Sequence, residues 1–390
     1  MPQRLITIPL QQIEAILSES WAAFRGSSRF RDVPPLDPSW SLVGEAVLDR
    51  TFTLTTSVLT GLPVPERVRR AVSEARAARD LFLERGWLEE PADYHRPPPP
   101  LPPGGLAPGT AWTRTGRRRY GHLAFESGFA PHPYEPGRDR WLDHERNGTA
   151  HAFALEHEEP RPWLVCVHGF AMGTPVVNFA GFPVKQLHEE LGLNLLFPVL
   201  PLHGLRGAGR FSGGEVLDPD YMRMVHLFAQ AVWDVRRLID WLRDRSGEPI
   251  GIYGISLGGY VASLVASIQD DLRCVIAGIP AVDFPNLARD NEPWIMRRYD
   301  EEFEMDWQLI RAITYPVSPL AFEPRVPAER RFIYAGLADR VVKPDQPRAL
   351  WRHWGQPEIH WFSGGHVLGI WNGSIGPFLA RSLETAGMTR

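Results

Sequence analysis

The chain has 390 residues, of which 44% are hydrophobic and 23% are charged, close to the averages of globular proteins. This composition excludes disorder of the whole chain, and the length predicts two or three domains, or one large domain with an appendage. The net charge of −4 provides no basic field that would hold nucleic acid or anionic lipid.

The cysteines and the hydropathy pattern predict where the protein works. Cys166 and Cys274 both lie in apolar runs that resemble buried strands, which excludes a disulfide framework. The first ten residues lack the basic and apolar segments of a secretory signal. No apolar run approaches the ~20 residues that a membrane helix needs. We therefore expect a cytoplasmic protein without an integral membrane segment and without a nucleic-acid partner.

Residues 1–110 are expected to form a helical N-terminal extension. Apolar residues at spacings of three and four predict a helix over Leu10–Phe24 and a second over Pro65–Arg85, with Gly86 as its C-terminal cap. Residues 91–110 contain eight prolines, which favour extended backbone and a linker. Because exposed apolar stripes invite aggregation, we expect both helices to dock on the rest of the chain.

Residues 111–390 alternate short apolar runs with helix-length stretches, a pattern typical of an α/β fold with helices on both faces of a mostly parallel sheet. Eight strands are predicted, the first two antiparallel: Tyr120–Phe125, Ala150–Leu155, Trp163–Val167, Leu193–Val199, Pro249–Tyr253, Leu272–Ala277, Arg331–Ala335 and Glu358–Phe362. Helices are predicted between them: Phe182–Leu191, Tyr221–Arg245, Ser256–Ile268, Pro344–His353 and Ser374–Thr385. The segment at about 283–325 is an additional insertion.

The clearest chemical motif is Gly254-x-Ser256-x-Gly258, which lies between a predicted strand and an apolar helical run. The motif alone is weak, but this placement is typical of a nucleophile elbow, in which the serine adopts strained dihedral angles at a sharp turn. Glycines on either side allow the strand and the helix to approach closely. The helix N-terminus also favours negative charge that develops nearby. Ser256 is the predicted nucleophile.

A serine hydroxyl needs a base that is itself oriented by a carboxylate. His366 follows the last predicted strand, and Asp339 follows the strand before it, so both lie on loops that can reach Ser256. Asp283 also follows an apolar strand, but it precedes Phe284 and Pro285 at the start of the insertion, where a helix cap is expected. We therefore predict a triad of Ser256, His366 and Asp339.

These motifs, in the order Ser, Asp, His, resemble the α/β-hydrolase superfamily, and Val167–Phe170 is similar to its oxyanion-loop motif. The resemblance covers residues from about 112 to 390. It implies acyl transfer through a seryl ester, with the backbone amides of Phe170 and Leu257 holding the oxyanion and His168 bracing the loop. Pro201–Arg206 and the long N-terminal extension are similar to the family of α/β-hydrolase-domain-containing protein eighteen.

Two groups of residues near the expected site have two interpretations each. His203 and Arg206 either line the pocket rim or only pin their loop. The insertion is either a lid over an acyl pocket or a packed helical cap. Its aromatic residues are Phe284, Trp294, Tyr299, Phe303, Trp307 and Tyr315.

Metal and cofactor motifs fail at specific positions. His188 and His144 are each followed by glutamate, but both lack the second histidine of a zinc-peptidase motif. Gly207-x-Gly209 does not continue into the third glycine of a dinucleotide loop. No metal and no cofactor is therefore expected.

The sequence predicts a serine hydrolase that acts on carboxylic esters or thioesters, from small molecules or lipids. A halide or epoxide hydrolase is disfavoured, because those enzymes use an aspartate at the elbow, where this chain has Ser256. A serine peptidase or amidase is one alternative, although no propeller-like repeat precedes the catalytic motifs. A non-catalytic scaffold that binds a ligand or partner through the N-terminal extension is another. The sequence indicates neither the acyl chain, the leaving group nor the oligomeric state.

Overall fold

The described part of the molecule comprises residues 30–389 of the computed structural model, apart from positions 38, 61–63, 103, 114–115, 219 and 292–305. The helix expected over Leu10–Phe24 lies outside these residues, as do the aromatic residues of the insertion at positions 294, 299 and 303. Two long helices of the extension are described, α2 (Trp40–Thr60) and α3 (Pro65–Glu84). α3 matches a predicted helix, whereas α2 is an addition to the predicted elements.

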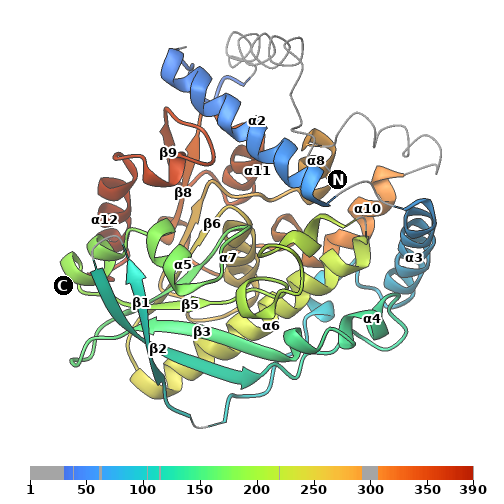
Figure 1. The fold of residues 1–390 in the computed structure, drawn as a ribbon, viewed down its shortest axis with the longest axis horizontal. Coiled ribbons are helices and arrows are strands. Elements are labelled where there is room, and N and C mark those ends of the chain that lie inside the picture. The colour runs from blue at the N-terminus through green and yellow to red at the C-terminus, as the bar shows by residue number, and fades with distance from the viewer. Residues whose placement is uncertain are drawn as a thin grey trace, which may run out of the picture.

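A mixed sheet runs through the centre of the described structure, in the order β1-β2-β3-β5-β4-β6-β7-β8-β9 (Figure 1). The antiparallel part comprises β1 (Ala107–Thr113), β2 (Gly116–Glu126) and β3 (Thr149–Leu155), which also pairs antiparallel with β5. The parallel part comprises β5 (Asn194–Pro198), β4 (Trp163–Val167), β6 (Ile250–Ile255), β7 (Val275–Gly278), β8 (Arg331–Gly336) and β9 (Glu358–Phe362). β4, β5, β6 and β7 are buried at every residue, because helices cover both faces.

The described sheet has nine strands, so the prediction of eight is wrong by one. The additional strand, β1, begins inside the segment 91–110, which is predicted as a linker from its eight prolines. As an edge strand, β1 tolerates a proline without losing a ladder hydrogen bond. Gly109 lies opposite Tyr120, and a Cβ atom at Gly109 would lie 2.4 Å from the tyrosine ring. The predicted boundary between residues 110 and 111 therefore falls within a strand.

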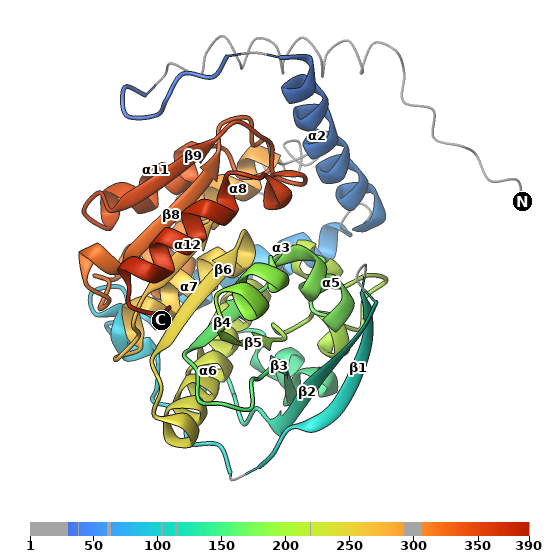
Figure 2. The ribbon, with the colours of Figure 1, turned by 90° about the vertical axis from the view of Figure 1, so that its left-hand side faces the viewer.

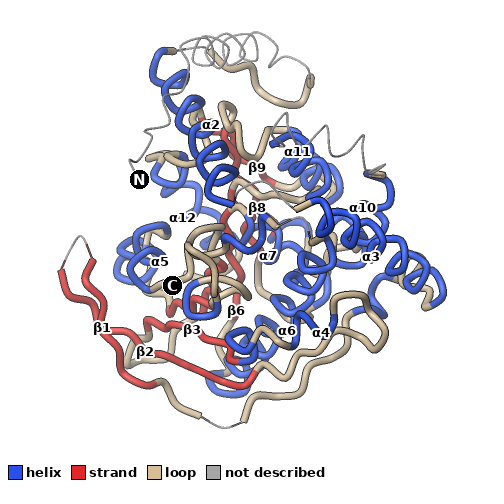
Figure 3. The backbone as a smooth tube through the Cα atoms, turned by 45° about the vertical axis from the view of Figure 1, so that its right-hand side comes forward, coloured by secondary structure: helices blue, strands red, loops and turns tan. Residues whose placement is uncertain are grey.

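Helices cover both faces of the sheet (Figure 3). Alternate residues of β4 show the division: Val165 belongs to one hydrophobic core, and Leu164 and Cys166 belong to the other. The core that contains Val165 is covered by α3, α6 (Tyr221–Ser246), α7 (Leu257–Ile268), α10 (Trp307–Thr314) and α11 (Asp345–His353). The opposite core is covered by α5 (Pro175–Gly181), a π-helical turn at Lys185–Glu190 and α12 (Ile375–Thr385).

The proline-rich segment is held against α6 and is not a free spacer. It begins with a short 3₁₀ helix, Pro91–Tyr94, in which Pro91 and Tyr94 are buried. The guanidinium group of Arg237 donates to the carbonyl oxygens of Pro99 at 2.9 Å and of Glu126 at 2.7 Å. The carbonyl oxygen of Pro99, which the neighbouring prolines leave without an N–H donor, is thus bonded to α6.

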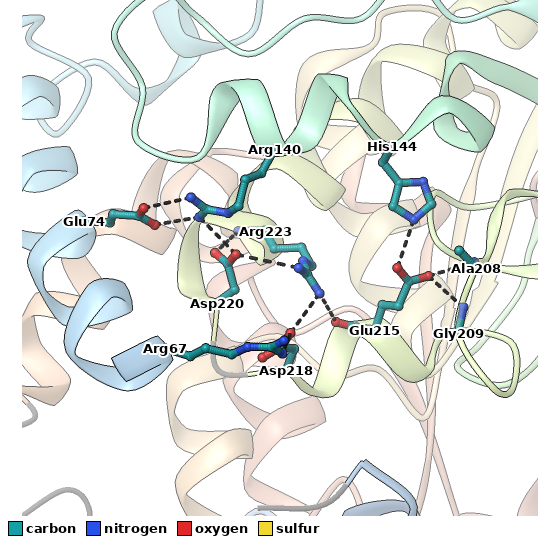
Figure 4. A network of polar contacts seen from close by, with 10 residues as sticks. All are labelled: Arg67, Glu74, Arg140, His144, Ala208, Gly209, Glu215, Asp218, Asp220 and Arg223. Carbon is teal, nitrogen blue, oxygen red and sulfur yellow. Dashed lines mark hydrogen bonds and ion pairs between the residues drawn. The ribbon is translucent and has the colours of Figure 1, made fainter. Parts of the chain in front are cut away.

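α3 is docked through its apolar face and through ion pairs. Phe82 is fully buried within the larger core, as the predicted apolar stripe requires. On the polar side, Arg140 of α4 (Arg138–Leu142) donates to both oxygens of Glu74 at 2.8 and 2.7 Å, and to Asp220 at 3.1 Å (Figure 4). Asp220 is itself the N-cap of α6. The ion pairs therefore join α3, α4 and α6.

The insertion after β7 contains α8 (Phe284–Asn291) and α10. Phe284 makes edge-to-face contacts with Phe228 and Tyr260, at centroid distances of 5.3 and 6.0 Å. Trp307 also packs on the larger core. These two aromatic side chains support the interpretation of a packed helical cap.

α2 lies beyond the ends of β8 and β9 (Figure 2). Leu42, Val43 and Ala46 on this helix form a small hydrophobic cluster with Leu337 and Ala338, which directly follow β8. Among the described helices, none is long and apolar enough to cross a membrane.

Candidate active site

Ser256 lies at the turn between β6 and α7, with φ 56° and ψ −114°. Residues with a side chain rarely adopt such a positive φ, so the turn is strained. Two glycines permit it. A Cβ atom at Gly254 would lie 2.0 Å from the carbonyl oxygen of Gly258, and one at Gly258 would lie 2.0 Å from that of Val167. The Gly-x-Ser-x-Gly pattern thus forms the tight strand-to-helix turn that was expected of it.

The structure brings Ser256, His366 and Asp339 together. The Ser256 hydroxyl lies 2.9 Å from Nε2 of His366, and Nδ1 of His366 lies 2.6 Å from Oδ2 of Asp339. Because a carboxylate only accepts, Nδ1 carries the proton and Nε2 faces the serine as the acceptor. The other oxygen of Asp339 accepts the backbone N–H groups of Val341 and Val342 at 2.9 and 2.7 Å. The carboxylate is 1% exposed and is held firmly.

Asp283, the alternative acid, is used elsewhere. Its Oδ1 accepts the backbone N–H of Asn286 at 3.1 Å, which is the N-cap arrangement expected at the start of α8. Its Oδ2 forms an ion pair with Arg311 of α10 at 3.0 Å. Both carboxylate oxygens therefore serve the insertion.

Burial and charge act in opposite directions on the imidazole. Burial disfavours the imidazolium form of His366, but the adjacent Asp339 carboxylate and the charge of Asp49 outweigh it and raise the pKa of His366 above 6.5. A base with a raised pKa is better able to accept the proton of a serine hydroxyl.

The two amides predicted to hold an oxyanion belong to segments next to the serine. Leu257 is the first residue of α7, where backbone N–H groups lack an intrahelical partner. Gly169 of the oxyanion loop lies against the elbow, since a Cβ atom there would be 3.5 Å from that of Ser256. The next residue is Phe170, whose backbone N–H has no hydrogen-bond partner among the described residues.

His168 braces this loop, as predicted. Its Nε2 must accept the backbone N–H of Leu200 at 3.1 Å, so Nδ1 carries the proton and donates to the carbonyl of Gly169 at 2.8 Å. Burial, together with the nearby His203, lowers the pKa of His168 to about 3. The neutral ring therefore ties the oxyanion loop to the end of β5.

His203 and Arg206 are fully buried, so neither lies at an exposed pocket rim. Nδ1 of His203 bonds to the carbonyl of Pro201 at 2.8 Å. Arg206 donates to the carbonyl groups of Val199 and Asn147 at 3.0 and 2.8 Å. Arg206 also forms a buried ion pair with Asp234 of α6 at 2.9 Å. Of the two interpretations, the structure supports the one in which these residues pin their loop.

The same loop is held on its outer side by Glu215. This carboxylate accepts the backbone N–H groups of Ala208 and Gly209 at 2.9 and 3.2 Å, and it lies 2.9 Å from Nε2 of His144 (Figure 4). The segment Gly207–Gly209 resembles part of a dinucleotide loop in sequence. Two of its backbone N–H groups are already bonded to a side chain of the protein itself, that of Glu215.

Two acidic residues of α2 at the site are missing from the sequence prediction. Asp49 accepts the backbone N–H groups of His366 at 2.8 Å, Val367 at 2.9 Å and Arg340 at 3.0 Å. Glu45 accepts that of Gly365 at 2.7 Å. The only available signal is their spacing of four residues, which places both carboxylates on one helix face. No local pattern connects them to a loop more than 300 residues away.

The described residues contain no group of three or more His, Cys, Asp and Glu side chains arranged to hold a metal ion. The two cysteines are buried as thiols: burial raises the pKa of Cys166 well above its ordinary value and that of Cys274 to about 12. Neither thiol has the lowered pKa of a reactive cysteine.

Comparison with known proteins shows which proteins this chain is similar to. Residues 231–354, which include the elbow and Asp339, match the prolyl oligopeptidase family. Two uncharacterized proteins of Mycobacterium tuberculosis, MT2702 of strain CDC 1551 and Rv2627c of strain ATCC 25618, are each 38% identical over 382 residues, covering 97% of this chain and 91% of the relative. Acetyl xylan esterase 1 from a Thermoanaerobacterium species aligns with a TM-score of 0.51 at 15% identity, over 77% of this chain and 92% of the esterase.

The match to the esterase extends over most of both chains and shows the same fold. The finer resemblance to α/β-hydrolase-domain-containing protein eighteen stays a prediction. The identity to the mycobacterial proteins covers almost the entire sequence, N-terminal extension included. The chain therefore belongs to the family of these mycobacterial proteins, within the α/β-hydrolase superfamily of serine hydrolases.

Proposed function

We propose that this serine hydrolase cleaves carboxylic esters or thioesters through an acyl-enzyme on Ser256. The observation that carries the proposal is the continuous chain of hydrogen bonds from Ser256 through His366 to Asp339, on three loops that follow β6, β9 and β8. The substrate is proposed to be a small molecule or a lipid acyl ester that the enzyme meets in the cytoplasm.

The mechanism follows from which atoms hold protons. The Ser256 oxygen attacks the carbonyl carbon while its proton passes to Nε2 of His366, and Asp339 stabilises the resulting imidazolium. The tetrahedral oxyanion is held by the backbone N–H groups of Leu257 and Phe170. As the carbonyl reforms, the bond to the alcohol or thiol breaks, and Nε2 returns the proton to that leaving group. Water then repeats the attack on the seryl ester and releases the acid.

A peptidase is the second candidate, because residues 231–354 match a peptidase family. The same triad cleaves amides when it protonates the leaving amine. Esters and thioesters are preferred because an alcohol or thiol leaves with less assistance than an amine. The described residues ahead of β1 form α2, α3 and a 3₁₀ helix, so they are helical and form no propeller.

The insertion at about 283–325 is proposed to border the acyl site, since it directly follows β7 and is anchored through Asp283. Deletion of residues 292–305, which leaves the core-packed α10 in place, is expected to change the preference among acyl chain lengths. An unchanged preference would contradict this assignment.

The purified chain should be tested with p-nitrophenyl esters of graded acyl length, matched thioesters, aminoacyl and peptidyl p-nitroanilides, and a serine-directed fluorophosphonate probe. We expect probe labelling, together with ester or thioester turnover well above p-nitroanilide turnover. Faster anilide cleavage would establish the peptidase alternative.

Ser263→Ala is a matched control for labelling, because Ser263 lies in α7, is fully buried and bonds only within its helix at the carbonyl of Gly259. Labelling is expected to survive this substitution and to be lost in Ser256→Ala. Absence of labelling in the unmodified chain would favour the non-catalytic scaffold.

A further inference from the structure

α2 contacts three of the loops that form the candidate site: the histidine loop after β9, the acid loop after β8 and the oxyanion loop after β4. Asp49 bonds to backbone N–H groups of the histidine loop and of the acid loop, at His366 and Arg340. Phe52, one turn further along the helix, meets Phe170 of the oxyanion loop edge to face, at a centroid distance of 6.3 Å. One helix of the N-terminal extension therefore touches the histidine, acid and oxyanion loops.

We propose that α2 contributes to the function of the site and that Asp49 on this helix is a positioning residue. Asp49 holds His366 in line with Ser256 and adds negative charge beside the Asp339–His366 pair. This inference rests on the proposed function.

The glycines before the histidine fit this role. A Cβ atom at Gly365 would lie 2.9 Å from Oδ2 of Asp49, and one at Gly364 would lie 3.3 Å from Oε2 of Glu45. Side chains at these positions would therefore press against the two carboxylates. The Gly364-Gly365 pair allows α2 to approach the backbone of the histidine loop closely enough to accept its N–H groups.

Asp49 occupies a position where a negative charge is costly. It is 1% exposed, and burial together with repulsion from Asp339 raises its pKa. Three N–H donors favour its carboxylate form. An asparagine has only one acceptor oxygen, so it cannot reproduce these three bonds. The aspartate thus combines loop positioning with charge next to the imidazole.

The charged groups around the imidazole come from two directions. Asp339, from the loop after β8, and Asp49, from α2, act on the imidazole itself. Arg340 lies near both carboxylates and near Arg50, and Glu45 bonds to the backbone of Gly365. Asp49 stabilises the imidazolium form of His366. Removal of its charge should therefore leave His366 neutral to a lower pH.

The test compares Asp49→Asn and Asp49→Glu with Asp32→Asn in the full chain. Asp32 is a matched control because it also joins the N-terminal region to the hydrolase, through ion pairs with Arg348 and Arg352 at 2.6 and 2.7 Å, but on α11. The readouts are kcat, KM, the pH profile of kcat/KM, the rate of fluorophosphonate labelling and the melting temperature.

For Asp49→Asn, we expect kcat to fall by about 10²-fold with little change in KM, since a small misplacement of a catalytic group has this effect. We also expect the acidic limb of the profile to move to lower pH. Asp49→Glu should keep the limb near its original pH while lowering kcat. Asp32→Asn should lower the melting temperature without shifting the acidic limb of the pH profile.

A purely structural Asp49 would lower the melting temperature like Asp32 and leave the pH limb and kcat unchanged, and that result would overturn the inference. Should Asp49→Asn fail to fold, Gly365→Ala tests the same contact from the other side and should lower kcat; unchanged kcat there would also overturn it. An unmodified chain that does not label would instead refute the proposed function. If labelling depends on Ser256 but the Asp49 variants keep the kcat and the pH profile of the unmodified chain, the inference alone is refuted.

Discussion

At the scale of single residues, the candidate site depends on protons whose positions are determined by their neighbours. Asp339 accepts Nδ1–H of His366, so Nε2 is left to accept the proton of Ser256. His168 carries its proton on the same ring nitrogen, Nδ1, but its Nε2 accepts a backbone N–H, its pKa is lowered and its ring braces a loop. Two buried histidines near one serine thus have different roles because their hydrogen-bond partners differ.

Ser256→Ala should abolish ester turnover and probe labelling while the melting temperature stays within a few degrees, because the hydroxyl supplies chemistry and little packing. Loss of the nucleophile in a comparable triad lowers kcat by roughly 10⁶-fold. Steady-state kinetics and a thermal melt of the same preparation measure both effects. Turnover at the original rate would refute the assignment.

Asp339→Asn should lower kcat by up to ~10⁴-fold with substrate binding retained, because the imidazole loses the partner that fixes its tautomer. Asp283→Asn is the matched control, since Asp283 is an acid that also follows a strand but caps α8. Its effect on kcat should be far smaller. Parallel kinetics decide between the two acids, and a larger loss at Asp283 would reverse their roles.

The pH dependence of kcat/KM should show an acidic limb with its midpoint above pH 6.5. The pKa of His366 is raised, and only the neutral imidazole accepts the serine proton. As the pH falls through this raised pKa, the imidazole becomes protonated and the rate falls. A profile of kcat/KM between pH 4 and 9 measures the limb. A midpoint well below 6.5 would contradict the electrostatic account.

At the scale of elements, the turn between β6 and α7 depends on glycines that have no room for a side chain. The carbonyl oxygen of Val167, at the end of β4, approaches Gly258 so closely that three elements meet at this residue. Close packing of β4, β6 and α7 is what exposes the serine above the sheet. The elbow is therefore a product of sheet packing as well as of the local motif.

Gly258→Ala should lower the free energy of unfolding by about 3 kcal/mol, the upper end of the usual cost of overpacking, because the new Cβ atom would overlap backbone that cannot move freely. Gly44→Ala is the opposite control. Gly44 is in the interior of α2 with no atom within 4 Å of a Cβ atom, so alanine should stabilise by about 0.5–1 kcal/mol. Urea unfolding of both variants measures the contrast. Equal stabilities would show that the elbow is looser than described.

At the scale of the whole molecule, the N-terminal extension and the hydrolase share one core. Phe82 of α3 packs with Trp87 and Tyr94, and all three belong to the core that also contains residues of β4 and β6. The ion pairs of Glu74 and Arg140 reinforce this contact. The extension is therefore expected to unfold together with the sheet.

Phe82→Ala should destabilise the entire protein by about 3–5 kcal/mol, since it removes a fully buried aromatic side chain. Leu83→Ala is the matched control, because the side chain of Leu83, the next residue along α3, is 49% exposed and its loss should cost less than about 0.5 kcal/mol. A single cooperative transition in urea is expected for both. A chain that starts at Ala111 should be insoluble or inactive, because it interrupts β1 and exposes the core; soluble, fully active protein would contradict this expectation.

The sequence by itself determined the features whose chemistry is local. These features are the tight turn at Ser256, the order of the parallel strands along the chain and the helix at Pro65–Arg85, and each depends on residues within a turn or a few turns of one another. The choice of Asp339 over Asp283 as the acid stays a prediction. Gly, Ser, Asp and Pro have backbone preferences strong enough to indicate such structures without any distant contact.

Only the tertiary structure decided the rest. β1 forms despite Pro108 because β2 supplies its partner, and Arg206 is buried because Asp234 of α6 neutralises it. Asp49 meets the backbone of His366 across 317 residues of sequence. Such contacts depend on where the fold brings distant segments together. A carboxylate on a helix face is identical in sequence whether water or the histidine loop lies opposite it.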